Sequence, residues 1–292
     1  MIVKDLVSQF SKDITPAYTA ADGEILTFRT VDCFGGAVKT DGDFPEDLNE
    51  EDSDLATGLV FVEGAEPGDV LKVDILDVDV DSQGVTCAMG GPLAGSCEPR
   101  VKVVPIRDRV ASFNDLKWEV DPMIGVIGVA PAGDPIACVQ IGDHGGNMDS
   151  KMIKKGSSVY LPVQVSGGLL GMGDIHASMG DSELCGTGIE IAGDITVRVS
   201  VIKGFELAFP VTETKDKWYV NCARAEYQTA LNDVCAEMQR LLMNAYGWDA
   251  TDTYLYMSLQ CDIEINQFTL PCPIDMCIRA GVPKVPGKEL VK

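Results

Sequence analysis

Short apolar runs and period-two alternation fill the first two thirds of the chain. Residues 59–62 (LVFV) form a compact apolar run, and residues 101–104 and 159–165 provide two more short apolar segments. Within residues 71–75 apolar and polar side chains alternate, which is the pattern of a β-strand with one buried face. This part of the chain is therefore predicted to consist mainly of strands.

The alternation contains one irregularity. Leu76 directly follows Ile75, and Val78 and Val80 then carry the pattern onward. One additional residue of this kind predicts either a β-bulge within a single strand or a turn between two strands.

The clearest alternation has an apolar residue at every second position of residues 195–201. Gly193 and Asp194 precede this segment, and Ile189 and Ile191 alternate with Glu190 on the other side of them. Glycine and aspartate between two strand-like segments are typical of a tight turn, so a β-hairpin is predicted here.

The period changes after Gly204. Apolar residues at spacings of three and four in residues 227–245 predict one amphipathic helix near 223–246, with Gly247 as its C-terminal cap. A shorter helix is predicted to begin at Thr251 or Asp252, which are good N-cap residues.

Residues 263–268 then alternate again as a strand. The predicted fold class is mainly β with a C-terminal α+β portion. We expect a β-rich catalytic body over residues 1–205 and an α+β portion over residues 206–292 packed on it.

Composition and charge exclude several classes. The 292 residues are 46% hydrophobic and 23% charged, as in globular proteins, and the net charge is -22. Such an acidic surface repels nucleic acid and anionic lipid. No apolar run reaches the ~18–20 residues of a membrane span, and the N-terminus lacks signal-peptide features, so a cytoplasmic location is expected.

The ten cysteines do not form a recognisable metal or disulfide motif. There is no CxxC pair, and the closest spacing joins Cys272 and Cys277. Without an export signal, we expect mostly reduced thiols that serve as small buried side chains.

Both histidines of the protein lie in polar, glycine-rich stretches that interrupt the strand pattern. His144 lies in residues 143–149 (DHGGNMD), and His176 lies in residues 173–183 (GDIHASMGDSE). Imidazole and carboxylate groups are ligands for borderline and hard cations. Turn residues next to glycine are common without any function, but both histidines fall into such stretches, which favours a site.

Asp174 and His176 are two residues apart, so on an extended segment both face the same side. They are predicted to bind one metal ion together with Asp149. His144 can complete the site, and Glu183, across a glycine turn, can face the open position. Burying these carboxylates together is costly unless a cation or protons neutralise them.

Three further features carry weaker predictions. Residues 90–95 are glycine-rich but precede no helix, which disfavours a phosphate site. Gly91 is a candidate for lining a substrate pocket with its backbone, and the alternative is a plain turn. Cys185 lies close to Glu183 and is a candidate nucleophile. Residues 154–158 (KKGSS) contain lysine and serine without the rest of a Ser–Lys arrangement.

At these residues the sequence resembles the acetamidase/formamidase family. The similar segments are residues 62–69 (VEGAEPGD), 122–131 (PMIGVIGVAP), 144–149 (HGGNMD), 156–163 (GSSVYLPV) and 173–190 (GDIHASMGDSELCGTGIE). The resemblance covers nearly the whole chain and is strongest over residues 120–205.

Two departures stand out. Family members usually read HPLTGP before the LVFV strand, whereas residues 54–59 here are DLATGL, which lack one histidine and two prolines. The family's GDGE element is GDSE at residues 180–183, so both carboxylates remain. The first departure raises the alternative of a binding protein that has lost turnover.

The resemblance implies hydrolysis of a short-chain aliphatic amide to a carboxylate and ammonia by a protein with β-sandwich and barrel parts. It further implies a divalent metal, zinc or alternatively calcium, a small neutral amide substrate, and a homodimer or larger homo-oligomer. Glu183 is then the catalytic base, Asn147 holds the substrate amide, and His144 is a ligand or an oxyanion donor. A metal-independent amidohydrolase using Glu183 with Cys185 or another nucleophile is the second alternative.

Overall fold

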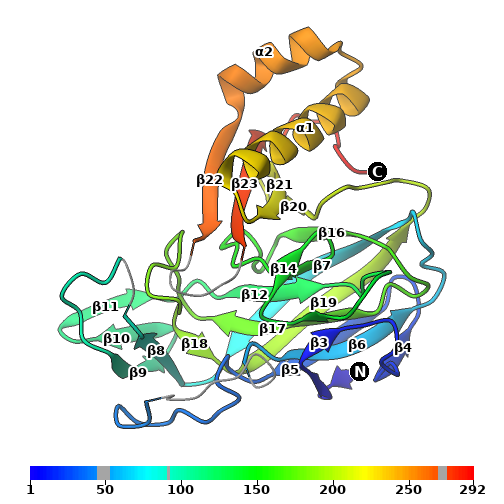
Figure 1. Ribbon diagram of the computed structural model, residues 1–292. Coiled ribbons are helices and arrows are strands. Elements are labelled where there is room, and N and C mark those ends of the chain that lie inside the picture. The colour runs from blue at the N-terminus through cyan, green and yellow to red at the C-terminus, as the bar shows by residue number, and fades with distance from the viewer. Residues whose placement is uncertain (45–52, 91–92, 269–274) are drawn as a thin grey trace.

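A computed structural model describes residues 1–44, 53–90, 93–268 and 275–292 of the chain. Two large sheets make up most of it, with two helices near the C-terminus (Figure 1). The mainly β fold class with a C-terminal helical portion is thereby confirmed.

The first sheet has nine strands, and neighbours in the following order are hydrogen-bonded: β1 (Ile2–Val3), β5 (Ile25–Thr30), β19 (Gly193–Ile202), β7 (Val70–Val80), β16 (Ser158–Pro162), β20 (Val211–Glu213), β21 (Lys217–Arg224), β23 (Met276–Pro283) and β22 (Asp262–Gln267).

The second sheet has twelve strands, nine of which follow one path: β11 (Leu116–Glu119), β10 (Val110–Phe113), β9 (Arg100–Arg107), β8 (Gln83–Ala88), β18 (Glu190–Ile191), β17 (Leu170–His176), β12 (Met123–Gly128), β15 (Gly145–Asn147) and β14 (Ile141–Gly142). Beside β17, β6 (Ala56–Val62) adds β2 (Leu6–Val7) and β4 (Tyr18–Ala20). A separate pair joins β3 (Gln9–Phe10) to β13 (Ile136–Ala137).

The largest hydrophobic core lies between the two sheets. Leu71 and Val73 of β7 bury their side chains in the same cluster as Ile127 of β12 and Ile175 of β17. Burying apolar side chains from both sheets stabilises the sandwich by about 25 cal/mol per Å² of apolar surface removed from water.

The irregularity at Leu76 is a β-bulge. Strand β7 continues through it, and along β19 Thr196 pairs with Asp77 while the next residue, Val197, pairs with Ile75. Leu76 is therefore the extra residue, and the first of the two alternatives is confirmed.

The hairpin predicted at Gly193 and Asp194 is wrong. β18 pairs with β17 and β8 in the second sheet, whereas β19 pairs with β5 and β7 in the first sheet. Gly193 already lies within β19, opposite Val80, and a Cβ there would come 2.4 Å from the carbonyl oxygen of Asp79. This glycine permits close strand contact instead of a turn, so the chain crosses between sheets at Ala192.

Helix α1 (Tyr227–Tyr246) confirms the long predicted helix. Gly247 ends it in the left-handed conformation, with φ 71°, and its N–H donates to the carbonyl oxygen of Met243. Helix α2 (Ala250–Gln260) begins earlier than predicted, because the side chain of Asp249 caps it by accepting from the N–H of Asp252 at 2.8 Å.

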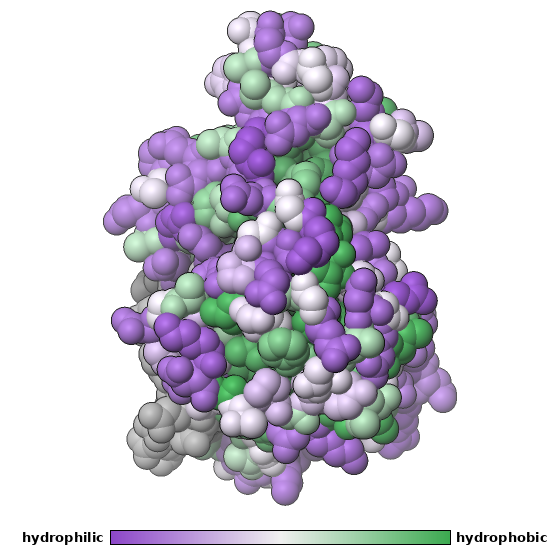
Figure 2. All heavy atoms as spheres, turned by 90° about the vertical axis from the view of Figure 1, so that its right-hand side faces the viewer, coloured by the Kyte–Doolittle hydropathy of each residue, from purple (hydrophilic) through white to green (hydrophobic). Residues whose placement is uncertain are grey.

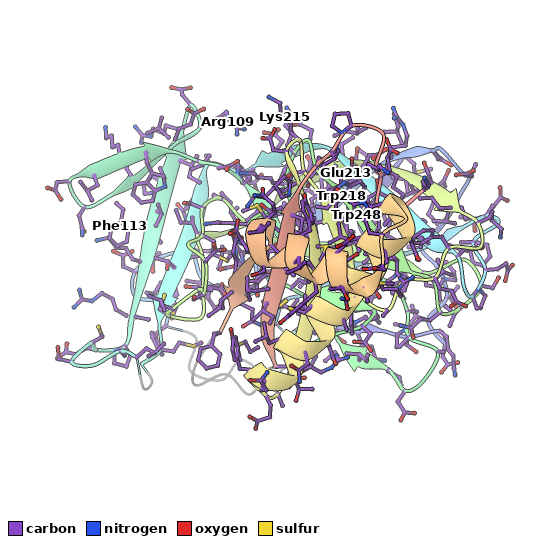
Figure 3. The ribbon with its side chains drawn as sticks, turned by 90° about the horizontal axis from the view of Figure 1, so that it is seen from above. Arg109, Phe113, Glu213, Lys215, Trp218 and Trp248 are labelled. Atoms are coloured by element: carbon purple, nitrogen blue, oxygen red, sulfur yellow. The ribbon has the colours of Figure 1, made fainter. Side chains whose placement is uncertain are left out.

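The C-terminal portion continues the first sheet through β20 to β23 (Figure 1). Helix α1 packs on β21 and β23 through a second core that includes Trp218, Met238 and Leu241. Seen from above, the helices lie near Trp218 and Trp248, far from Phe113 on β10 (Figure 3). The division of the chain at residue 205 stays a prediction.

Hydrophilic residues cover most of the face shown in Figure 2, in keeping with the large negative charge. Neither helix in the described ranges is both long and apolar enough to cross a membrane. The nine cysteines in those ranges are all free thiols, as expected, and Cys272 lies outside the described residues.

Candidate active site

The site forms where β12, β17 and β18 lie side by side in the second sheet. His176 ends β17 and stands directly opposite Glu190 of β18 on one side and Met123 of β12 on the other. Asp174 precedes His176 on the same strand, Asp149 follows β15, and Glu183 lies in the loop after β17. The two glycine-rich stretches therefore meet at one place.

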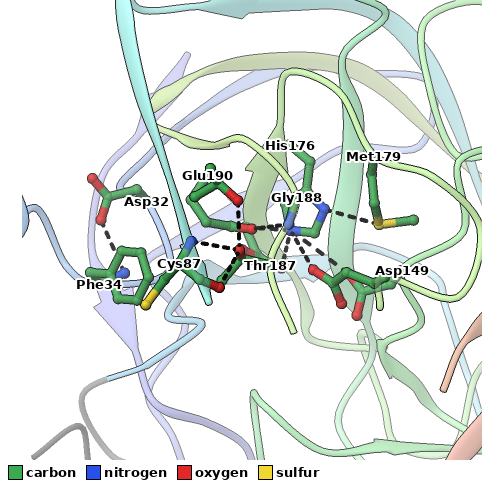
Figure 4. Close-up of polar contacts among 12 residues, drawn as sticks. Asp32, Phe34, Cys87, Asp149, His176, Met179, Thr187, Gly188 and Glu190 are labelled. Atoms are coloured by element: carbon green, nitrogen blue, oxygen red, sulfur yellow. Dashed lines mark hydrogen bonds and ion pairs between the residues drawn. The ribbon is translucent and has the colours of Figure 1, made fainter. Parts of the chain in front are cut away.

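Four buried carboxylates surround Nε2 of His176. Figure 4 labels two of them, Asp149 and Glu190, beside the imidazole. The nearest carboxylate oxygens lie at these distances from that nitrogen: Glu190 Oε2 3.1 Å, Asp174 Oδ2 3.2 Å, Asp149 Oδ1 3.9 Å and Glu183 Oε1 3.9 Å. The structure thus brings together Asp149, Asp174, His176 and Glu183. Glu183 lies as near to His176 as Asp149 does, so by geometry it suits either a ligand or a base.

Two glycines make room for this cluster. A Cβ on Gly125 of β12 would come 2.3 Å from Oδ2 of Asp174 and 2.5 Å from Oδ1 of Asp149. A Cβ on Gly188 would come 2.8 Å from the imidazole ring of His176. Side chains at either position would displace the groups that define the site.

Three of the carboxylate residues have strained backbones. Asp149, Asp174 and Glu183 have φ values of 42°, 53° and 47°, in the left-handed region that non-glycine residues rarely adopt. Asp174 therefore interrupts the alternation expected for an extended strand, although its carboxylate still reaches His176. Strain of this kind clusters at functional sites, where the surrounding structure maintains it.

Mutual burial shifts the pKa values of these groups in different directions. Burial lowers the pKa of His176, but the carboxylates of Glu190 and Asp174 outweigh it and raise that pKa well above its ordinary value. Burial also raises the pKa of Asp174, but the imidazole of His176 brings it below the usual range. Burial raises the pKa of Asp149 and Glu183 well above normal, and that of Glu190 to about 7.

Two sets of buried side chains have the donor atoms of a metal site. Within each set the candidate ligand atoms lie within 4.8 Å of one another. One set is Asp149, His176 and Glu183, and the other is Cys33, Asp174 and Glu190.

These donors fit a divalent cation. Oδ1 of Asp174 is buried and has no hydrogen-bond partner in the described structure, which leaves a carboxylate oxygen free to coordinate. The first set offers nitrogen and oxygen donors and the second offers sulfur and oxygen donors, and either combination suits zinc, whereas calcium prefers oxygen ligands alone. A cation would also offset the cost of burying several carboxylates together.

Sequence reasoning assigned no role to Glu190, Cys33 or Gly125. Burial, followed by the nearby charge of Glu190, raises the pKa of the Cys33 thiol well above its ordinary value. Asp54 belongs to the same surroundings, because burial and then the charges of Asp174 and Glu190 raise its pKa well above normal. The motif GTGIE contained Glu190, but only the pairing of β18 with β17 places it beside His176.

Asn147, predicted to hold the substrate, lies next to the cluster. With its amide nitrogen turned toward Asp149, it donates to the two carboxylate oxygens at 3.2 and 3.1 Å. Gly91, predicted to line the pocket, lies outside the described residues.

His144 lies apart from the carboxylates. Its ring packs edge-on against Phe10, with centroids 5.2 Å apart, and a Cβ on Gly128 would come 3.4 Å from it. Gly128 is three residues along β12 from Gly125, or about 10 Å at the usual rise of a strand. Burial lowers the pKa of His144 to about 4, so the imidazole is neutral at pH 7. These contacts favour packing, and its catalytic role stays a prediction.

The remaining candidates have ordinary partners. The thiol of Cys185 is exposed and lies 3.6 Å from the carbonyl oxygen of Thr187. Ser157 donates to the carbonyl oxygen of Lys154 within a turn, and the ammonium of Lys154 pairs with Asp121. In the described part of the chain, no hydrogen bond or ion pair joins Cys185, Ser157 or Lys154 to His176.

Comparison with known proteins adds a family assignment. The sequence profile of the Acetamidase/Formamidase family matches residues 4–137 and 136–283. A formamidase from Methylophilus methylotrophus is 29% identical over 246 residues, which cover 62% of this chain and 60% of that protein. The chain therefore spans less than two thirds of that relative's length.

Solved structures match over almost the whole chain. An acetamidase from Bacillus halodurans is 32% identical, with a TM-score of 0.92 and 97% of each chain covered. A predicted acetamidase/formamidase from Thermoanaerobacter tengcongensis is 35% identical, with a TM-score of 0.91, covering 97% of this chain and 95% of that one.

Proposed function

The chain belongs to the acetamidase/formamidase family, and we propose that it hydrolyses the C–N bond of a short-chain aliphatic amide, giving a carboxylate and ammonia. The observation that carries this proposal is the buried group of four carboxylates around Nε2 of His176. Amide hydrolysis needs an activated water, a stabilised oxyanion and a protonated leaving nitrogen, and groups of this kind can supply proton transfer.

The proposal includes a divalent metal, with zinc as the first choice and calcium as the alternative. Asp149, Asp174 and His176 are the proposed ligands. When bound, such an ion lowers the pKa of a water molecule and polarises a carbonyl oxygen. The unpartnered Oδ1 of Asp174 and the excess of buried carboxylates support its presence.

Glu183 is the proposed base. Its carboxylate takes the proton of the attacking water at Oε1 and delivers it to the amide nitrogen as the C–N bond breaks. Burial raises the pKa of Glu183 well above its ordinary value, which is the direction that favours return of the proton to the leaving nitrogen. Asn147, turned from Asp149 toward the substrate, is proposed to hold the amide group.

The direct test of this function is ammonia release from purified protein. Formamide, acetamide and propionamide would be compared at equal concentrations. Ammonia produced in proportion to enzyme supports the proposal. Its absence with all three, in protein that contains the metal, supports the alternative of a binding protein, for which the altered residues 54–59 are the motivation.

Two substitutions separate the roles of base and ligand. Glu183→Gln keeps the shape but removes the base, so kcat should fall by about 10²-fold or more while bound metal is retained. His176→Ala should lose metal and activity together. Metal analysis and steady-state kinetics provide both readouts, and Glu119→Gln, at an exposed end of β11, is the matched control.

Wild-type kcat in Glu183→Gln would show that Glu183 is not the base, and loss of metal in that variant would show that it is a ligand. A chelator separates the metal-dependent enzyme from the metal-independent alternative using Cys185. Activity that disappears on chelation and returns with zinc supports the first, whereas activity that survives complete metal removal supports the second.

The proposal also includes a cytoplasmic location, a small neutral amide as substrate, and a homodimer or larger homo-oligomer. Light scattering on the protein as it elutes from a size-exclusion column measures the molar mass of the assembly directly. A monomer at all concentrations would contradict the oligomer.

A further inference from the structure

The loop that carries Glu183 is attached to the C-terminal portion of the chain. The N–H of Ser182 donates to the carbonyl oxygen of Asn266 at 2.8 Å, and the N–H of Phe268 donates back to Ser182 at 3.2 Å. Asn266 lies in β22, and Phe268 directly follows that strand. The end of β22 is thus hydrogen-bonded to the loop after β17, more than 80 residues earlier in the sequence.

Asp181 joins three segments at this loop. Its two carboxylate oxygens accept from Nη1 and Nη2 of Arg279 on β23, at 3.0 and 2.9 Å. The ammonium of Lys151 lies 2.8 Å from Oδ2 of the same carboxylate. Because Lys151 is two residues from Asp149, the segments carrying Asp149 and Glu183 are connected through Asp181.

Arg279 itself is held firmly. Its side chain is 1% exposed, its Nε donates to Glu264 at 2.6 Å, and its Nη1 donates to Asn266 at 2.7 Å. The guanidinium also lies 5.7 Å from the ring centre of Tyr219. A planar, bidentate group fixed on several sides can impose both position and orientation on a carboxylate, which a lysine cannot do.

The loop needs such support because its backbone is strained. Ser182 and Glu183 have φ values of 81° and 47° in consecutive positions. A residue held in this conformation persists only where the surrounding structure maintains it. The contacts of Asp181 with Arg279, one residue before this pair, provide that restraint.

We propose that Arg279 is a positioning residue for Glu183, acting through Asp181 to hold the strained loop against the carboxylate cluster. The expected loss of kcat rests on the proposed function, whereas the expected loosening of the loop does not. It gives the C-terminal portion a role in amide hydrolysis although none of its residues lies among the predicted catalytic groups.

Kinetics of two variants provide the first test. Arg279→Lys keeps the positive charge but loses the bidentate contact, and Asp181→Asn keeps the shape but loses the charge. Each should lower kcat by about 10²-fold, the cost of a misplacement of about 1 Å, with KM changed by less than about threefold. Both substitutions break the same Arg279–Asp181 contact, so their effects should not add. The kcat of the double variant should be no lower than that of the less active single variant.

Arg240→Lys is the matched control. Arg240 pairs with Glu237 on α1 at 2.7 Å, in the same C-terminal portion. Its hydrogen bonds in the described structure go to Glu237 and to the carbonyl oxygen of Glu206, and not to the loop of Glu183. It should keep wild-type kcat and KM. A kcat loss in Arg240→Lys equal to that in Arg279→Lys, or a fall in kcat of Arg279→Lys of less than about threefold, would overturn the proposal.

Amide hydrogen exchange tests the structural part without any activity. In Arg279→Lys and Asp181→Asn, the N–H groups of Ser182 and Glu183 should exchange at least about tenfold faster, while β12 keeps wild-type protection. Unchanged exchange at both N–H groups would refute the positioning role even if amides prove to be the wrong substrates. Exchange that rises equally in β12 would also refute it, since the effect would then be global.

Discussion

Gly125 shows how a single absent side chain can determine a site. It lies on β12 opposite the strand that carries Asp174, and its lack of a Cβ lets two carboxylates approach the same point. The sequence contains this glycine in the segment PMIGVIGVAP, but its purpose becomes visible only from the atoms that would collide with a larger residue.

Replacing Gly125 with alanine should therefore disrupt the site. The new Cβ would lie 2.3 Å from Asp174 and 2.5 Å from Asp149, and these atoms would have to move. We expect bound metal to fall and kcat to drop by about 10²-fold or more, measured by metal analysis and steady-state kinetics. Gly133→Ala is the control, because nothing lies within 4 Å of its Cβ.

If the Gly125→Ala protein binds metal and is active like wild type, then either Asp149 or Asp174 is dispensable for metal binding and activity. Equal losses in Gly133→Ala would instead point to general damage by alanine in glycine-rich segments.

Sequence reasoning found part of this cluster. Asp149, Asp174, His176 and Glu183 could be grouped because all lie where strand periodicity breaks. Glu190 sits within strand-like sequence, and it approaches His176 only through the register between β17 and β18. Register is a long-range property, so local patterns did not reveal this neighbour.

Among the elements, local signals predicted α1 well and the crossing at Ala192 poorly. The helix has its own period and its own C-terminal glycine, both contained in about 25 residues. The two strands flanking Ala192 have the same alternation whether they pair with each other or belong to separate sheets. Which of these occurs depends on β5, β7, β8 and β17, all distant in sequence.

The turn before β7 illustrates how one carboxylate can connect elements. Asp69 accepts from the N–H groups of Glu66 and Gly204 at 2.9 Å each and from the ammonium of Lys203. It therefore links the start of β7 to the end of its neighbour β19. Burial acts to raise the pKa of Asp69, but these hydrogen bonds lower it below the ordinary value.

Asp69→Asn should reduce the free energy of unfolding by about 1–3 kcal/mol at pH 7, because two N–H groups and an ammonium lose a charged acceptor. A lowered folded-state pKa adds stability above the unfolded pKa of about 3.9, and this is lost as pH falls through the folded pKa. The difference from wild type should thus shrink below about pH 4.

Urea unfolding at several pH values between 7 and 3 measures this difference. Asp115→Asn, in the exposed turn between β10 and β11, provides the comparison and should leave stability nearly unchanged. A deficit in Asp69→Asn that is constant with pH would show that the charge of Asp69 contributes nothing.

For the molecule as a whole, charge is the dominant global property. A net charge of -22 on 292 residues makes the folded chain repel itself. The screening length falls from about 30 Å at 0.01 M salt to about 10 Å at 0.1 M. We therefore expect the melting temperature to rise by several degrees as NaCl is increased over this range.

Differential scanning calorimetry measures the melting temperature, and a parallel KCl series separates screening from binding of a particular ion. A melting temperature that falls with both salts would mean that ion pairs such as Arg279–Asp181 outweigh the overall repulsion.

The crossing at Ala192 has a consequence for how the molecule comes apart. Glu190 on one side belongs to the carboxylate cluster, and Gly193 on the other begins the ten-residue β19, the third of the nine strands in the neighbouring sheet. Because Glu190 is only three residues from the start of β19, detachment of β19 would also move Glu190 away from His176. The carboxylate cluster therefore cannot persist once the adjacent sheet unfolds, and the cluster and the sandwich should unfold as one cooperative unit.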